Sequence, residues 1–324
     1  MITFSTDMIA PRDRFDHWRD QRGKKLFGVT LELERERRTS FSGNFQASTV
    51  GGATLATISA SAYRISRTPL DIADMPIDSL LVSQQVSGPG WCDNGKGQPF
   101  FITGGMLMAG HSDHPFTSTP STASRFQFRT VKIPLNSAQS FARFAQHLPV
   151  TPFDPGAGSY SGLMAASFTA LFDTASPLAK TEAEQSVDAL GQLVLLARGL
   201  VAPGAQASRL AVRTAHRHAL RQVMRRHCHR MDFSAEIAAP MLGISERQIH
   251  AIFEPTGRSF MATLQAMRVE EACRLLMARP AMRVAEIGFA CGFRSLATFY
   301  RAFQGIVGVA PNDYRQWPGD RSLH

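Results

Sequence analysis

Residues near the C-terminus combine side chains that can read DNA bases with the spacing of a single helix face. The period of a buried helix face is shown by Leu296, Phe299, Tyr300 and Phe303. A step of about 100° per residue turns the opposite face outward. That outward face carries Arg294, Thr298 and Arg301, with Ala297 at its flank. Because arginine pairs with guanine and threonine with several bases, the predicted chemistry is recognition of base edges.

The element that must position this face is a second, shorter helix in front of it. The residues from Ala285 onward show an apolar period, and Cys291-Gly292-Phe293 supplies a tight turn. Two helices joined by a short turn with glycine form a helix-turn-helix, whose second helix fits the major groove of DNA. The sequence therefore predicts a DNA-reading unit between Ala285 and Arg315.

A similar pattern occurs upstream. Gly243 leads to Phe253 in ten residues, as Gly292 leads to Phe303 in eleven. With Ile249, Ile252 and Phe253 pointing inward, the outward face of the first unit is predicted to contain Arg247, Gln248, His250 and Ala251. We expect DNA contacts from Arg247 and His250, whereas Ala251 could touch only a thymine methyl group. The second unit should therefore carry more of the sequence specificity.

The segment between the two copies predicts one uninterrupted helix. Ser259–Arg279 begins with a residue suited to the N-cap, contains no Pro or Gly, and is followed by Pro280. Its 21 residues would span roughly 31 Å, and successive major grooves on one face of B-DNA lie about 34 Å apart. A single chain could place its two outward faces in adjacent grooves.

The two copies and the helix between them form one combined pattern. Its residues are Ser245, Ile249, Phe253, Gly257, Ser259-Phe260, Arg268-Val269, Ala272, Leu275-Leu276, Ile287, Gly292-Phe293, Phe299, Arg301, Phe303, Gly308-Val309, Pro311 and Tyr314-Arg315. On these residues the segment 206–317 resembles the DNA-binding domain of the AraC/XylS family of bacterial transcription regulators. The resemblance implies a sequence-specific regulator of double-stranded DNA, most often an activator that contacts RNA polymerase and forms a homodimer.

The chain departs from the family pattern at three positions. Ala251 replaces an outward arginine near the end of the first reading helix, and Arg283 replaces a capping Ser or Thr. Pro240 falls inside the first scaffold helix, where it removes a hydrogen bond and should bend the helix. We expect these departures to affect how firmly each helix-turn-helix binds DNA more than they affect the fold.

The distribution of charge agrees with a phosphate-binding C-terminal third. From Gln206 onward the chain has 17 basic residues, all Arg, and 9 acidic ones, whereas residues 1–205 have 18 basic and 17 acidic residues. The excess positive charge therefore belongs to the segment that carries the repeated pattern. A solvated basic surface without a ligand is the alternative that charge alone would allow.

The N-terminal part predicts a β-rich domain. Short strands are indicated by 29–33, 54–58, 80–82, 100–102 and 124–129, separated by turn sequences such as Ser87-Gly88-Pro89-Gly90. This pattern is typical of a β sandwich or a barrel of jelly-roll type. The predicted fold class is α+β, with a β domain over 1–202, a linker over 203–207 and an all-α tandem helix-turn-helix domain over 208–317.

The β-rich part resembles, less specifically, the cupin-like N-terminal domain of an AraC subgroup. The residues that carry this likeness are Arg14-Phe15-Asp16-His17-Trp18-Arg19-Asp20, Gly105-Met106-Leu107-Met108 and His114-Pro115-Phe116. The resemblance implies a small-molecule effector or a dimerisation role. Candidate effector-binding residues are Trp91, Phe101, His111 and Phe126. Two predicted helices, 159–173 and 180–201, could form the dimer contact or simply pack on the β domain.

The histidines favour no metal site. His111 and His114 form a loop pair without a companion Glu or a third His. The set His216, His218, His227, Cys228 and His229 lacks the i, i+4 spacing that chelates a metal on one helix face. We therefore expect no metal, no cofactor and no enzyme activity. The alternatives are a metal-dependent cupin enzyme fused to a DNA-binding tail, and a regulator whose N-terminal domain only dimerises.

Cysteine use and hydropathy indicate the compartment. The four Cys residues at 92, 228, 273 and 291 share no CxxC spacing, which favours a reducing environment. No signal peptide opens the chain, and no apolar run approaches the ~20 residues of a membrane span. The expected location is the cytoplasm, without a membrane partner.

Overall fold

The protein divides into two units, which are described separately below. The computed structural model describes residues 1–96, 99–121, 124–154, 160–173, 178–254 and 257–316. Contacts divide the chain into Met1–Ala215 and His216–His324. This boundary lies inside helix α6 (Gln206–His227), which begins within the segment 203–207 predicted as a linker.

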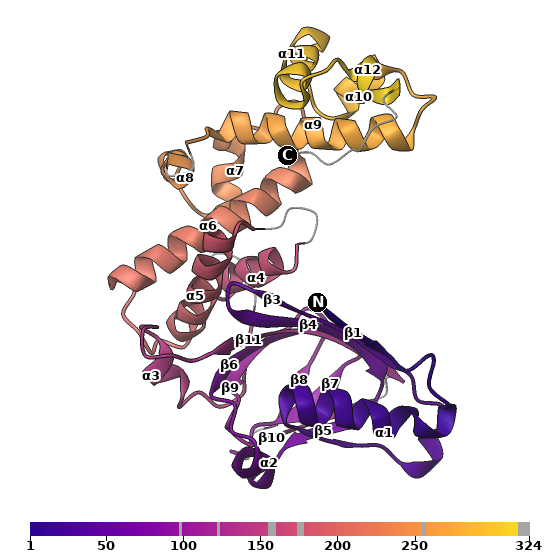
Figure 1. Ribbon diagram of the computed structural model, residues 1–324. Coiled ribbons are helices and arrows are strands. Elements are labelled where there is room, and N and C mark those ends of the chain that lie inside the picture. The colour runs from indigo at the N-terminus through magenta and orange to yellow at the C-terminus, as the bar shows by residue number, and fades with distance from the viewer. Residues whose placement is uncertain (97–98, 122–123, 155–159, 174–177, 255–256, 317–324) are drawn as a thin grey trace. The chain divides into compact units, whose positions relative to one another are not determined.

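The N-terminal unit contains two antiparallel sheets (Figure 1). The seven-stranded sheet has the order β1-β3-β4-β11-β6-β9-β12, and the five-stranded sheet has the order β2-β5-β10-β7-β8. The strands are β1 (Ile2–Ser5), β2 (Thr30–Glu32), β3 (Gly43–Val50), β4 (Ala53–Ser61), β5 (Arg64–Arg67), β6 (Ser79–Ser87), β7 (Gly90–Asp93), β8 (Phe100–Ile102), β9 (Leu107–His111), β10 (Phe116–Pro120), β11 (Arg125–Pro134) and β12 (Thr151–Phe153). The five segments predicted as strands correspond to β2, β4, β6, β8 and β11.

Helices cover one face of the seven-stranded sheet. In Figure 1, α4 (Tyr160–Leu171) and α5 (Lys180–Ala197) lie against this sheet. Leu190, Leu193 and Val194 of α5 are fully buried in a core that also contains Val82 and Val131. The apolar stripe that the sequence offered as a possible dimer contact is thus packed within the N-terminal unit.

The opposite side of the unit is built on an aromatic cluster. After β1 the chain forms a 3-10 turn (Pro11–Asp13), α1 (Arg14–Trp18) and a π-helix (Arg19–Phe27) in succession. Phe15 and Trp18 are buried, and their rings contact Phe41 at centroid distances of 5.3 and 5.7 Å. The described part of the unit also contains a 3-10 turn (Arg35–Arg37) and two short helices, α2 (Pro69–Asp74) and α3 (Ala142–Ala145).

The described part of the C-terminal unit is helical. After α6 come α7 (Ala235–Leu242), α8 (Glu246–Phe253), α9 (Phe260–Ala278), α10 (Val284–Ala290), α11 (Leu296–Val307) and α12 (Pro311–Gln316). Ser259 caps α9 by accepting a hydrogen bond from the Ala262 N–H at 3.1 Å. Pro240 lies inside α7, which ends within one turn at Gly243 in the left-handed region with φ 64°. The helix continues for two residues beyond Pro240 and is eight residues long.

Two hydrophobic cores occupy the two halves of α9. The first contains Phe260 and Leu264 of α9 together with Ile249 and Phe253 of α8. The second contains Val269 and Leu276 further along α9, together with the apolar residues of α10 and α11, among them Ile287, Phe299 and Phe303. Each helix-turn-helix therefore packs on its own half of one long helix (Figure 1).

Within the described residues, none of the helices is both long and apolar enough to cross a membrane.

Candidate nucleic-acid interface and ligand cavity

Helix α11 is fixed at both ends and along one face. The Ser295 hydroxyl accepts a hydrogen bond from the Thr298 N–H at 3.2 Å, and Gly308 ends the helix with φ 86°. Phe299 and Phe303 are fully buried. The remaining face exposes Ala297, Thr298 and Arg301, as the sequence predicts, and Arg294 is exposed just before the helix begins.

The exposed residues of the second helix-turn-helix differ in how many hydrogen bonds they already make within the protein. Arg294 donates from Nε to the Met231 carbonyl at 2.9 Å, and the Thr298 hydroxyl lies 2.9 Å from the Ser295 hydroxyl. Within the described chain Arg301 has no hydrogen bond or ion pair. Arg301 is therefore the arginine of this face whose guanidinium is ready to donate to a base or a phosphate.

The turn before α11 needs a glycine. Gly292 has φ 86°, and a Cβ at this position would collide with the Cys228 carbonyl at the end of α6. The Gly292 N–H donates to the Phe289 carbonyl at 2.9 Å, which closes the turn after α10. This close approach sets the angle at which α11 leaves the turn.

Helix α8 presents the first predicted face. The Gln248 amide oxygen accepts hydrogen bonds from the Ser245 N–H at 2.8 Å and the Ser245 hydroxyl at 3.1 Å. Gln248 therefore acts as part of a capping box, which leaves its NH2 group as the free end for DNA. His250 lies 3.5 Å from Glu246, and Arg247 and Ala251 are exposed beside it. All eight residues predicted to contact DNA are thus exposed, four on each helix-turn-helix.

One buried arginine joins three segments of the C-terminal unit. Arg268 of α9 is 5% exposed and donates from Nε to the Cys228 carbonyl at 2.8 Å and from Nη2 to the Arg230 carbonyl at 2.6 Å. Its guanidinium also lies 5.9 Å from the centre of the Phe293 ring. Arg268 holds the end of α6, the middle of α9 and the turn before α11 in one arrangement. The sequence marked Arg268 as a motif residue without predicting this role.

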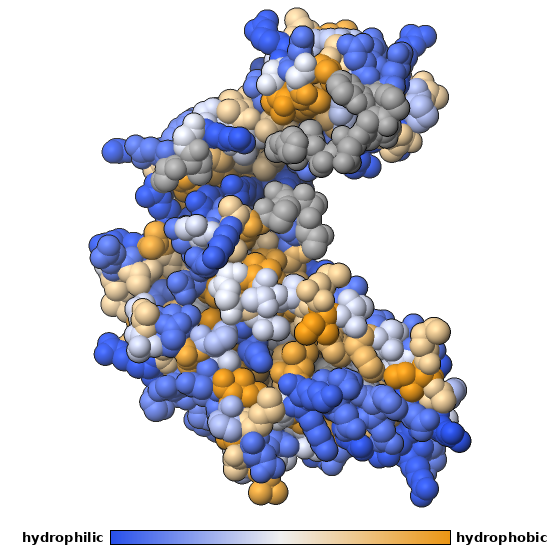
Figure 2. Space-filling model, in the orientation of Figure 1, coloured by the Kyte–Doolittle hydropathy of each residue, from blue (hydrophilic) through white to orange (hydrophobic). Residues whose placement is uncertain are grey.

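The surface of the C-terminal unit that Figure 2 shows in its upper part is largely hydrophilic. Among the described residues of the whole chain, no group of three or more His, Cys, Asp or Glu side chains is placed to hold a metal ion. Burial, together with the nearby charges of Arg217 and Arg221, lowers the pKa of His218 to about 4. His218 is therefore neutral near pH 7.

The N-terminal unit encloses a cavity of about 160 Å³ between its two sheets. Its walls are mainly aromatic and aliphatic, and they include Phe27, Tyr63, Phe116, Phe126 and Phe128. Of the four candidate effector residues, Phe126 lines this cavity. The rings of Trp91 and Phe101 contact each other in a tilted arrangement, with centroids 5.0 Å apart, and the two residues are 51% and 39% exposed. His111 is buried outside the lining and bonds through Nε2 to Asp78 at 3.0 Å.

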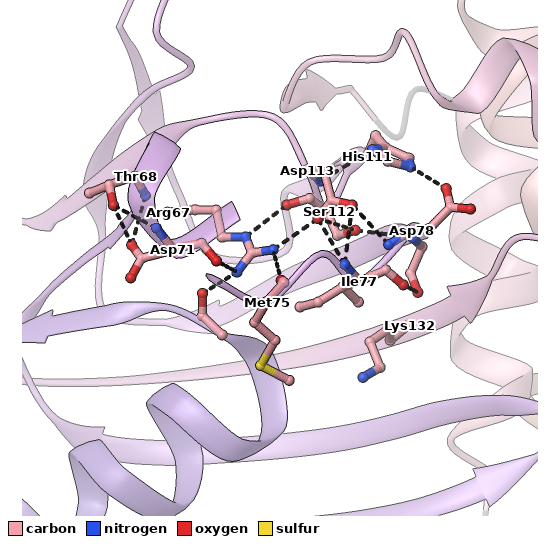
Figure 3. A network of polar contacts seen from close by, with 12 residues as sticks. Arg67, Thr68, Asp71, Met75, Ile77, Asp78, His111, Ser112, Asp113 and Lys132 are labelled. Atoms are coloured by element: carbon pink, nitrogen blue, oxygen red, sulfur yellow. Dashed lines mark hydrogen bonds and ion pairs between the residues drawn. The ribbon is translucent and has the colours of Figure 1, made fainter. Parts of the chain in front are cut away.

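A polar network surrounds Arg67 in the wall of the cavity, and its contacts are drawn in Figure 3. Arg67, which lines the cavity, donates to the Asp113 carboxylate at 2.8 Å and to the backbone carbonyls of Met75, Ser112, Asp71 and Gly28. Burial raises the pKa of Asp113, but hydrogen bonds from the Asp78 N–H, Arg67 and the Ile77 N–H outweigh it and lower the pKa. Asp113 therefore stays ionised and neutralises Arg67.

Sequence reasoning did not single out the two cations of the cavity, Arg67 and Lys132. Lys132 could have been found by extending the alternation of 124–129, because Phe126, Phe128, Thr130 and Lys132 share one face of β11. No local sequence pattern indicated that Arg67 lines the cavity, since most of its hydrogen-bond partners come from segments far away in the chain.

Comparison with known proteins places the C-terminal unit among DNA-binding domains. Residues 238–316 match a family model described as a helix-turn-helix domain. The chain is 25% identical over 300 residues to the transcriptional activator NphR of Rhodococcus sp, covering 90% of this chain and 86% of that protein. It is 34% identical over 82 residues to the HTH-type transcriptional regulator GlxA of Rhizobium meliloti (strain 1021), covering 25% of each. The crystal structure of the AraC-like transcriptional activator CuxR is 16% identical, with a TM-score of 0.49, covering 90% of this chain and 99% of that one.

Proposed function

We propose that the chain is a DNA-binding transcription regulator with a helix-turn-helix domain of the AraC type, and that it is a sequence-specific activator controlled by a small molecule. The observation that carries the proposal is the pair of capped helices, α8 and α11, each with a buried and an exposed face. Both pack on α9, whose 19 residues span roughly 28 Å, close to the repeat of the major groove.

Base reading is assigned to the exposed residues of the two helices. Arg301 and Thr298 on α11, and Arg247 and His250 on α8, are the side chains placed to reach base edges. Arg294 and Gln248, which also support the fold, are assigned to contacts with phosphates or to positioning. Ala297 and Ala251 are assigned apolar contacts with thymine methyl groups.

The role of the N-terminal unit is the second part of the proposal. We assign its two facing sheets to a cupin-like jelly roll and its cavity to the effector. An effector that favours one arrangement of the two units would shift DNA affinity by its differential affinity for the two states. A homodimer, contact with RNA polymerase and a cytoplasmic location are proposed from the resemblance alone. No observation on the described residues favours the metal-dependent enzyme over the regulator.

Selection of bound sequences from a random pool of DNA duplexes tests the DNA part of the proposal. The full chain should enrich a defined sequence with two conserved blocks, because two helices read it. Enrichment of no sequence over the starting pool, at a salt concentration that suppresses non-specific binding, would contradict it.

Replacing Arg301 with alanine tests base reading by α11. We expect binding to the selected sequence to weaken by roughly 1–3 kcal/mol and preference at one base pair to relax, because one guanidinium is lost from the groove. Titration of fluorescent duplexes that differ at single base pairs measures both effects. Arg279→Ala, at the exposed end of α9, is the matched control. Equal weakening on every duplex would assign Arg301 to a phosphate instead.

A further inference from the structure

One strand supplies the cavity with a row of side chains that ends in a cation. On β11, the residues Phe126, Phe128, Thr130 and Lys132 line the cavity, while Val131 and Ile133 point into the core under α5. The Thr130 hydroxyl accepts from the Ser83 hydroxyl at 2.9 Å on the neighbouring strand β6. The row therefore runs from two aromatic rings, through a hydroxyl pair, to an ammonium group.

Lys132 has no negative partner among the residues that the structure describes. Its Nζ donates to the Leu26 carbonyl at 3.3 Å, which is the only bond it makes with the described residues and uses one of its three N–H groups. Figure 3 shows Lys132 beside the polar network with no bond into it. Burial lowers the pKa of Lys132, as expected for a cation held away from water.

The rest of the lining does not compensate this charge. None of the described residues that line the cavity is Asp or Glu. The second cation, Arg67, is by contrast paired with Asp113 at 2.8 Å and surrounded by backbone carbonyls. Burying part of an ammonium group costs free energy of solvation unless an anion pairs with it. The cavity can therefore accommodate a ligand that carries one negative charge.

The cavity volume limits the size of the ligand. An engineered protein cavity of about 150 Å³ holds benzene, so about 160 Å³ admits a body of one six-membered ring. The aromatic side chains of Phe126 and Phe128 offer apolar contact to such a ring, and Lys132 lies on the same strand face.

We propose that the effector is a small carboxylic acid whose apolar part is about the size of one six-membered ring, and that Lys132 binds its carboxylate. This inference rests on the proposed effector role of the N-terminal unit and adds the chemical class of the ligand. The remaining N–H groups of Lys132 would donate to the carboxylate, and Thr130 and Ser83 lie on the same wall.

Calorimetric titration of the full chain tests the proposal with two acid and amide pairs. The probes are benzoate with benzamide, and cyclohexanecarboxylate with cyclohexanecarboxamide, at pH 7. Each acid should bind roughly 10- to 100-fold more tightly than its amide, because only the acid forms a charge-assisted hydrogen bond. Lys132→Met should abolish this ratio, and Lys180→Met, at the exposed start of α5, should preserve it. Lys132→Gln replaces the methionine variant if the latter does not fold.

Three results would overturn the proposal. They are equal affinity for acid and amide, an acid preference that survives the loss of Lys132, and no binding of any probe. Equal affinity would leave the cavity as an effector site and remove only the assigned ligand class. An absence of binding, together with a successful DNA selection, would remove the effector role and leave the DNA-binding function intact.

Discussion

Gly292→Ala is expected to destabilise the C-terminal unit by roughly 3 kcal/mol or more and to abolish specific DNA binding. The residue has φ 86°, a conformation that alanine adopts at a cost, and its Cβ would collide with the Cys228 carbonyl. A carbonyl of the main chain cannot move aside as a flexible side chain can. The collision would push the turn before α11 away from the end of α6, and α11 would lose its orientation.

Gly305→Ala is the matched control for this change. Gly305 lies within α11, and a Cβ there would meet nothing within 4 Å. Alanine should therefore stabilise this helix by about 0.5–1 kcal/mol. Chemical denaturation, with hydrogen exchange of the amides in Leu296–Val307, compares the two variants. If both variants matched the wild type in stability and exchange, the close approach at Gly292 would not be a constraint.

Arg268→Met is expected to cost about 3–5 kcal/mol of stability, the second largest effect. Methionine fills much of the space of the arginine stem, but it cannot donate to the Cys228 and Arg230 carbonyls. Hydrogen bonds from a charged donor are worth about 1.5–3 kcal/mol each, and two are lost. Because these bonds join α9 to the end of α6, we also expect faster hydrogen exchange in both segments.

Arg274→Met on the same helix is the control for Arg268→Met. Arg274 is exposed and pairs with Glu271 on the surface, so its loss should change stability by no more than about 1 kcal/mol. Thermal and urea unfolding of the full chain measure both variants. Similar losses for the two would mean that the buried hydrogen bonds of Arg268 add little.

The sequence predicted the C-terminal unit well because its signals are local. Helical period, the cap at Ser259 and the glycine turns act over one or two turns of chain. Ser245 and Ser295 cap α8 and α11 in the same way, although they are not among the predicted caps. The exposed faces of α8 and α11 followed from the same period. The spacing Ser245-x-x-Gln248 is itself the local signature of a capping box, so the engagement of the Gln248 oxygen could have been predicted. The bond from Arg294 to the Met231 carbonyl joins distant segments and leaves no local signal.

The N-terminal unit was less predictable because its contacts are distant in sequence. Strand β3 carries only Phe45 and Ala47 in the buried core, too few apolar residues to stand out as a strand. Arg67 finds Asp113 across 46 residues, which no periodicity reveals. The lining of the cavity depends on how the strands of two sheets are paired, so Phe126 was a candidate while Lys132, on the same strand face, was not.

The central claim is that α8 and α11 read neighbouring major grooves from one long helix. Its most direct test is sequence selection with Arg247→Ala and Arg301→Ala side by side. Each variant should lose preference in a different block of the selected sequence, and the two blocks should be separated by about 10–10.5 base pairs. Loss of preference at the same positions in both variants, or a uniform loss of affinity with the preferred sequence unchanged, would contradict the claim.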